Sequence, residues 1–208
     1  PVISVSLKSM KQRTFEEAFD VFKDIIRAEI LRHKSILLNN PSIEKTDLEK
    51  LTRFVELKAD KSDYNTSIGF ISTLLASAYN KKVIILIDEY DVPLENAFHQ
   101  GFYNDMVNLI RSVFESALKT NPSLDRAFLT GCLRVSKESI FTGFNNPKVY
   151  SITKNKFSQY FGFTQDEIKE LLSYYSLEQY TDTIKEWYDG YLFGRTEIYN
   201  PWSVLNCV

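Results

Sequence analysis

Cysteine and histidine are scarce in this 208-residue chain, which holds two of each. The cysteines, Cys132 and Cys207, form no CxxC pair, and the histidines, His33 and His99, stand apart from them and from each other. Isolated thiols are typical of a reducing compartment, so no disulfide framework is expected. With so few ligands and no metal spacing, a zinc site and a histidine-based catalytic triad have little support.

An excess of charge of either sign is also absent. The chain has 25 Lys and Arg against 27 Asp and Glu, a net charge of -2, which gives no overall electrostatic footprint for nucleic acid and leaves room only for a local patch. No signal peptide and no apolar run long enough to span a bilayer occurs, so we expect a cytoplasmic protein without membrane contact. The 12 Tyr and 15 Phe are assigned to core and protein-contact surface, because no basic interleaving accompanies them.

What the chain does have is an apolar run that ends in acidic residues, at residues 83–91 (VIILIDEYD). An unalternating apolar run predicts a strand buried on both faces of a parallel sheet, and ligands bind outside the carboxyl ends of such strands. Many nucleotide hydrolases end this strand in Asp-Glu, where the first carboxylate supports Mg²⁺ and the second accepts the proton of an attacking water. A strand-end carboxylate can equally cap the next helix or pair with an arginine.

The remaining patterns predict an α/β fold with a parallel sheet flanked by helices. Capping boxes are predicted at Thr14/Glu17, Thr46/Glu49 and Thr164/Glu167. Residues 92–101 are predicted to be a loop. Alternation of strand and helix to about residue 153 assigns residues 1–153 to an α/β core and residues 154–208 to a small helical lid subdomain. Strands are predicted at residues 1–7, 83–87, 127–131 and 148–152. Helices are predicted at residues 14–38, 46–59, 66–79, 102–119 and 136–141. In the C-terminal subdomain, one helix is predicted to begin at residue 164, another to end near residue 187, and a last one to begin at residue 200.

Four segments together resemble one protein family. They are residues 83–94 (VIILIDEYDVPL), 128–146 (FLTGCLRVSKESIFTGFNN), 157–164 (FSQYFGFT) and 187–204 (WYDGYLFGRTEIYNPWSV). In this order they resemble the predicted AAA-ATPase-like proteins of bacteria, whose P-loop ATPase domain is often followed by a nuclease-like domain of the PD-(D/E)XK type. The resemblance implies a P-loop NTPase-like sheet with a C-terminal lid, and ATP and Mg²⁺ as cofactors.

The resemblance also implies roles for individual residues. Asp88 and Glu89 would be the Walker B pair, with Asp88 holding the magnesium shell and Glu89 polarising the attacking water. Thr130, at the tip of the next strand, matches the position that senses the terminal phosphate. Arg134 could contact a phosphate or a neighbouring subunit of a homo-oligomer, or form a salt bridge to Asp88 or Asp91. Asp91 is expected to be a structural acceptor or an arginine partner.

Two aromatic segments are expected to pack rather than to bind a ligand. Tyr90 lies within the acidic cluster, and the segment Trp187-Tyr188-Asp189-Gly190-Tyr191 lies in the predicted lid. Large aromatic side chains chiefly serve packing, so we expect this segment to form the core of the lid.

One departure from the family concerns the phosphate loop. No G-x-x-x-x-G-K-[ST] sequence occurs in the chain, so the triphosphate lacks its principal anchor here. We therefore expect a fragment of a longer protein, with a sheet incomplete at its N-terminal side and the upstream phosphate loop and downstream nuclease-like domain outside it. Nucleic acid would be contacted only through that missing domain.

These patterns suggest three functions, from the best supported to the least supported. The first is an ATP hydrolase that uses Asp88 and Glu89. The second is a nucleotide-sensing interaction module, in which ATP binding sets a conformation without turnover. The third is a metal-dependent phosphodiesterase that uses Asp88, Glu89 and Asp91.

Overall fold

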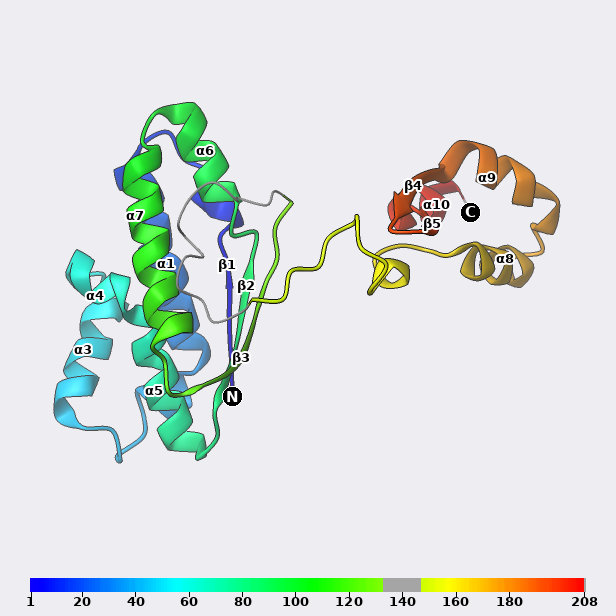
Figure 1. The fold of residues 1–208 in the computed structure, drawn as a ribbon. Helices are drawn as coiled ribbons and strands as arrows, with labels where there is room; N and C mark the ends of the chain where they lie inside the picture. Colours follow the sequence, from blue (N-terminus) through cyan, green and yellow to red (C-terminus); the bar gives the residue numbers. More distant parts are fainter. Residues whose placement is uncertain (133–146, 208) are drawn as a thin grey trace. The chain divides into compact units, whose positions relative to one another are not determined.

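The computed structural model describes residues 1–132 and 147–207. The chain divides into two compact units, Pro1–Asn145 and Asn146–Val208 (Figure 1). Among the described residues, no helix is both long enough and apolar enough to cross a bilayer. The predicted helix at residues 136–141 lies outside the described residues. The assignment of residues 154–208 as a lid stays a prediction.

The first unit is built on a three-stranded parallel sheet with the strand order β1-β2-β3. The strands are β1 (Val2–Ser6), β2 (Val83–Asp88) and β3 (Leu124–Leu129). Val5 of β1 pairs with Ile87 of β2, which in turn pairs with Leu129 of β3. The predicted α/β fold with a parallel sheet flanked by helices is confirmed.

Helices connect the strands and cover one face of the sheet. A 3-10 turn, η1 (Lys8–Met10), follows β1. The helices between β1 and β2 are α1 (Phe15–Arg32), α2 (Lys34–Leu37), α3 (Lys45–Val55), α4 (Lys61–Asn65) and α5 (Ser67–Tyr79). Those between β2 and β3 are α6 (Val92–Gln100), α7 (Tyr103–Phe114) and the π-helical turn η2 (Glu115–Lys119).

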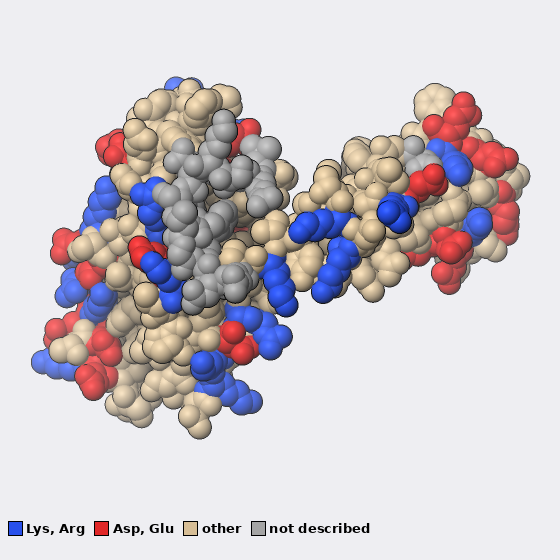
Figure 2. Space-filling model, in the orientation of Figure 1, with Lys and Arg blue, Asp and Glu red and all other residues tan. Residues whose placement is uncertain are grey.

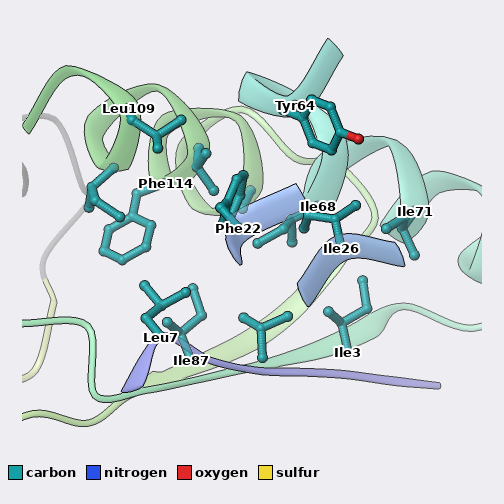
Figure 3. Packing of buried hydrophobic residues seen from close by; sticks show 14 of the residues in the cluster. Ile3, Leu7, Phe22, Ile26, Tyr64, Ile68, Ile71, Ile87, Leu109 and Phe114 are labelled. Atoms are coloured by element: carbon teal, nitrogen blue, oxygen red, sulfur yellow. The ribbon is translucent and has the colours of Figure 1, made fainter. Parts of the chain in front are cut away.

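The core of the first unit lies between this sheet and the helices. Figure 3 shows Ile3, Leu7 and Ile87 of the sheet side facing Phe22 and Ile26 of α1. Burial alternates along β2, with every second residue fully buried and Ile84 and Leu86 only half-buried. The prediction of a strand buried on both faces is therefore wrong for the described residues, because the second face of the sheet is covered less completely than the first.

The outer edge of β1 is closed by side chains of α1. Glu29 is 4% exposed and accepts a hydrogen bond from the Ser4 N–H at 3.0 Å. Arg32 donates to both Glu29 oxygens, at 2.8 and 2.6 Å, and to the Val2 carbonyl at 2.7 Å. The His33 ring nitrogen lies 3.0 Å from the same carbonyl. We call Glu29, Arg32 and His33 the edge clasp, since they occupy backbone groups that an added strand would need.

One helix near the acidic cluster was not expected. Residues 92–101 were predicted to be a loop, yet α6 occupies Val92–Gln100. Pro93 lies in the first helical turn, where its missing N–H costs nothing, and Gly101 ends the helix with a φ of 88°. The two residues that suggested a loop are thus the start and stop signals of a short helix.

The capping boxes are formed to different extents. The box at Thr164 and Glu167 is complete, with both reciprocal hydrogen bonds present. Thr14 caps α1 by accepting from the Glu17 N–H, whereas the Glu17 carboxylate accepts from the Arg13 N–H. The predicted box at Thr46 is wrong, because α3 already begins at Lys45 and has no side-chain cap.

The second unit contains helices and a β-hairpin. Its helical elements are η4 (Ser158–Tyr160), α8 (Gln165–Tyr174), η5 (Glu178–Tyr180), α9 (Thr181–Tyr188) and α10 (Pro201–Cys207), and the strands β4 (Asp189–Phe193) and β5 (Thr196–Tyr199) pair antiparallel. The hairpin was not predicted; residues rich in Tyr, Phe, Ile and Thr flank a turn at Gly194. The strand predicted at 148–152 is wrong, since these residues have no strand pairing.

The expected aromatic core of the second unit is also only partly formed. Trp187 is 74% exposed and Tyr191 is 51% exposed, so neither belongs to it. The buried cluster instead consists of Ile168, Leu172, Ile184, Tyr199 and Val204.

Candidate functional site

The carboxyl ends of the three parallel strands bring polar side chains into one row. Ser6 of β1 is the register partner of Asp88 of β2. Thr130 directly follows Leu129, the partner of Ile87, and its hydroxyl donates a hydrogen bond to Asp88 Oδ1. All three side chains of the row, Ser6, Asp88 and Thr130, are solvent-exposed. A carboxylate between two hydroxyls at this edge is an arrangement of hard oxygen atoms.

Glu89 has an unusual backbone conformation. Its φ is 53°, in the left-handed region. A residue with a Cβ pays about 1–2 kcal/mol to adopt this conformation, and such residues cluster at functional sites. The Glu89 side chain is half-buried, whereas the Asp88 side chain is exposed. The two carboxylates of the Asp-Glu pair therefore lie in different surroundings.

The backbone of Thr130 fixes this turn from the neighbouring strand. The Thr130 N–H donates to the Ile87 carbonyl at 2.9 Å, and the Thr130 carbonyl accepts from the Tyr90 N–H at 3.1 Å. Glu89 lies between these two anchor points. With its hydroxyl on Asp88, Thr130 contacts the acidic turn at three places, so a displacement of the end of β3 would move both carboxylates.

Gly131 permits this close approach. A Cβ placed on Gly131 would lie 2.5 Å from Asp91 Oδ1 and 2.9 Å from Tyr90 Cε1. Asp91 is 2% exposed and Tyr90 is 8% exposed, so neither could move aside into solvent. Only glycine fits between the end of β3 and the acidic turn.

The predicted site residues differ in where they lie. Asp88, Glu89 and Thr130 come together at the carboxyl end of the sheet, while Arg134 lies outside the described residues. Asp91 is buried at the start of α6, where its carbonyl accepts from the Leu94 and Glu95 N–H groups. That position suits a structural carboxylate better than an exposed ligand.

Sequence reasoning did not find two further residues of the site. Ser6 ends an ordinary alternating strand, and only the pairing of β1 with β2 places it beside Asp88. Gly131 was seen as part of a strand end, but its closeness to Tyr90 and Asp91 depends on the fold. No cluster of three or more His, Cys, Asp or Glu residues suited to a metal occurs in the part of the chain that the structure describes.

Comparison with known proteins identifies the family of this chain. The family model described as Predicted AAA-ATPase (AAA-ATPase_like) matches residues 1–141, which include β1, the acidic turn and the end of β3. An uncharacterized protein in the vnfD 5' region of Azotobacter chroococcum mcd 1 is 27% identical over 130 residues. That match covers 62% of this chain and 25% of the relative, so the matched part of the chain spans about a quarter of that protein. No solved structure matches the chain. Because the family model covers well over half of its residues, the chain belongs to the predicted AAA-ATPase family.

Proposed function

We propose that this chain supplies the metal-binding and water-activating half of an ATPase site. Asp88 would hold hydrated Mg²⁺, Glu89 would accept a proton from the attacking water, and Thr130 would sense the terminal phosphate. The observation that carries this proposal is the Asp88-Glu89 turn at the carboxyl end of a parallel strand, with the Thr130 hydroxyl on Asp88.

The residues present fit a magnesium–nucleotide complex. Mg²⁺ in such sites keeps several waters and is held by one or two carboxylates together with phosphate oxygens. Asp88 is exposed and flanked by the hydroxyls of Thr130 and Ser6, which can orient metal-bound waters. When bound, the metal would neutralise charge on the phosphates. Asp88, Glu89 and Asp91 do not form a metal-binding cluster in the part of the chain that the structure describes, which gives no support to the metal-dependent phosphodiesterase that would use all three.

Separate positions for the two carboxylates would support separate roles. Asp88 ends β2 and accepts a hydrogen bond from the Thr130 hydroxyl, whereas Glu89 follows in a left-handed backbone conformation and is half-buried. A general base must reach the proton that it removes, and its position matters before its pKa does. The strained turn would hold Glu89 at the phosphate side of the site. The principal anchor for the triphosphate would come from residues outside these 208, since the chain has no phosphate-loop sequence.

The test is Mg-ATP turnover by the full-length protein, compared with its Glu89→Gln variant. Removing a general base typically costs about 10²–10⁴-fold in rate, and binding of a fluorescent ATP analogue should persist because Gln keeps the shape of Glu. Glu95→Gln is the matched control. Glu95 is exposed in the first turn of α6, six residues after Glu89, and should not affect turnover.

Other outcomes would point to another function. Negligible turnover in all forms, with nucleotide binding intact, would favour a nucleotide-sensing module that sets a conformation or an assembly state. Loss of binding in Glu89→Gln would show that Glu89 holds the nucleotide and is not the base.

A further inference from the structure

The second unit separates its charges, and one group of its cations has no counter-ion among the described residues. Residues 147–165 and 190–196 contain no acidic residue, and together they carry Lys148, Lys154, Lys156 and Arg195. Figure 2 shows Lys and Arg gathered over one end of this unit and Asp and Glu over the other. The acidic residues belong mainly to α8, α9 and the segment between them.

The two groups of cations differ in their partners. On the acidic side, Lys169 lies 3.8 Å from Asp166 and Lys185 lies 3.7 Å from Glu197. By contrast, none of the four cations at the basic end forms an ion pair with any described residue. All four are exposed, so the basic end presents unneutralised charge to solvent.

Exposed aromatic rings lie among these cations, contrary to the expectations that no basic residues interleave with the aromatic ones and that nucleic acid is contacted only through another domain. The Tyr150 and Phe157 rings are 4.9 Å apart, and the Phe157 and Tyr160 rings are 6.2 Å apart. Lys156 Nζ lies 5.3 Å from the centre of the Tyr150 ring and 5.1 Å from that of Phe157. Tyr160 is 70% exposed, so its ring is available to a ligand.

The hairpin β4–β5 holds this loop and adds to the surface. The Gly194 N–H donates to the Ile152 carbonyl at 2.7 Å, and the Ser158 and Thr196 hydroxyls are 2.9 Å apart. These contacts place Arg195, which lies between Gly194 and Thr196, beside the lysine-bearing loop. A cleft of about 250 Å³ is lined by aromatic residues that include Phe161, Tyr191 and Phe193. Phe161 directly follows Tyr160 in the sequence, so the cleft adjoins the exposed rings.

We propose that this basic aromatic patch, formed by Lys148, Lys154, Lys156, Arg195, Tyr150, Phe157 and Tyr160, binds single-stranded nucleic acid. Proteins that bind single strands without sequence preference combine cations that follow the phosphates with aromatic rings on which bases stack. An acidic peptide would need the cations but would have no use for the exposed rings. A duplex would leave its bases stacked inside and out of reach of Tyr160. The patch is independent of the acidic turn in the first unit, so this proposal does not rest on ATP hydrolysis.

The experiment is fluorescence anisotropy of a labelled short oligo-thymidylate titrated with the full chain. Each neutralised phosphate of a single strand contributes a slope of about -0.7 in log affinity against log salt, so four contacts predict about -2.8. Affinity should then fall about 50-fold between about 50 and 200 mM salt. Lys154→Glu with Lys156→Glu should abolish binding. Lys169→Glu with Lys185→Glu, which makes the same change of net charge on the acidic side, should leave binding within about twofold of the unmodified chain.

The contribution of aromatic stacking to binding is tested with substitutions of Tyr160 and a matched control at Tyr174. Tyr160→Ala should weaken binding by about tenfold, within the range for loss of one stacked base, and Tyr160→Phe should restore it. Tyr174→Ala is the control, because Tyr174 is 82% exposed on α8, on the acidic side. Thermal melting of each variant establishes that it is folded.

Three results would overturn the proposal. The first is absence of binding by the unmodified chain at low salt. The second is unchanged affinity in Tyr160→Ala, which would leave only a general attraction for polyanions. The third is equal competition by polyglutamate, which would identify an acidic protein segment as the occupant.

Discussion

The two units of this chain use their apolar side chains in opposite ways. In the first, the cluster of buried residues draws on β1 and β2 and on α1, α3, α5 and α7, and partly buried residues of β3 pack against it. In the described part of the second, the cluster comprises five residues, and many aromatic side chains lie at the surface. The most exposed of these are Tyr160, Phe161, Tyr174, Trp187 and Trp202. Both units contain many aromatic residues. In the first unit most of these pack in the core, whereas in the second many are exposed to solvent.

This difference bears on how each unit can work. A dense core holds the ends of β2 and β3 in fixed register, which a site built from Asp88, Glu89 and Thr130 requires. A small core with many exposed rings provides contact area at the expense of stability. The first unit therefore suits the proposed ATPase chemistry, and the second suits the proposed binding of nucleic acid.

The largest effect is expected from the same deletion made in each core. Leu75 in α5 is 0% exposed and Leu172 in α8 is 1% exposed. Replacing either with Ala should cost about 3 kcal/mol. The first unit should stay folded in Leu75→Ala, whereas Leu172→Ala should unfold the second, whose five-residue core has no such reserve.

Hydrogen exchange followed by mass spectrometry separates the two units in this experiment. Protection should be lost over α8 to α10 in Leu172→Ala and kept over β1 to β3. Equal loss of protection in both units would show that their stabilities are not distinct.

The second effect concerns how the first unit protects its sheet. Glu29→Ala removes a buried carboxylate that binds the Ser4 N–H and Arg32, whose pKa is raised by its hydrogen bonds to Glu29. We expect a loss of about 2 kcal/mol, because the Ser4 N–H loses its acceptor while the half-exposed Arg32, which loses its counter-ion, can turn to water. Asp20→Ala breaks an exposed 2.7 Å pair with Lys23 on the same helix and should cost less than about 1 kcal/mol.

Urea denaturation of the two variants measures this difference directly. Similar midpoints for Glu29→Ala and Asp20→Ala would mean that the edge clasp adds no more than a surface ion pair. Concentration-dependent association of Glu29→Ala alone would show, in addition, that the clasp keeps the edge of β1 from pairing with other strands.

Local sequence patterns correctly predicted the elements whose position is set by residues close together in the sequence. The unbroken apolar run before Asp88 predicted the parallel strand, and the capping box at Thr164 marked the start of α8. Where Pro93 and Gly101 suggested a loop, the prediction failed because the same residues also begin and end helices.

What the sequence did not predict depends on contacts between distant segments. The hydrogen bond from the Ser4 N–H to Glu29 spans 25 residues, and that from Thr130 to Asp88 spans 42. Nothing near Glu29 marks it as the partner of a strand edge. The left-handed backbone at Glu89 is likewise imposed by the contacts of Thr130 on either side of it, and glutamate itself has no preference for that conformation.

The smallest effect expected is one that separates stability from function within the first unit. Glu89→Gly should be more stable than Glu89→Ala by about 1 kcal/mol, because both lose the side chain but only glycine adopts a φ of 53° without strain. The comparison with Ala removes the contribution of the carboxylate and leaves the backbone term. Urea denaturation of the two variants measures it. Equal stability would mean that the turn is not strained. The expected result is a higher stability of Glu89→Gly than of Glu89→Ala, together with loss of ATP turnover when Glu89→Gly is made in the full-length protein. It would show that the first unit keeps an energetically costly backbone conformation at a position where the proposed chemistry needs a carboxylate.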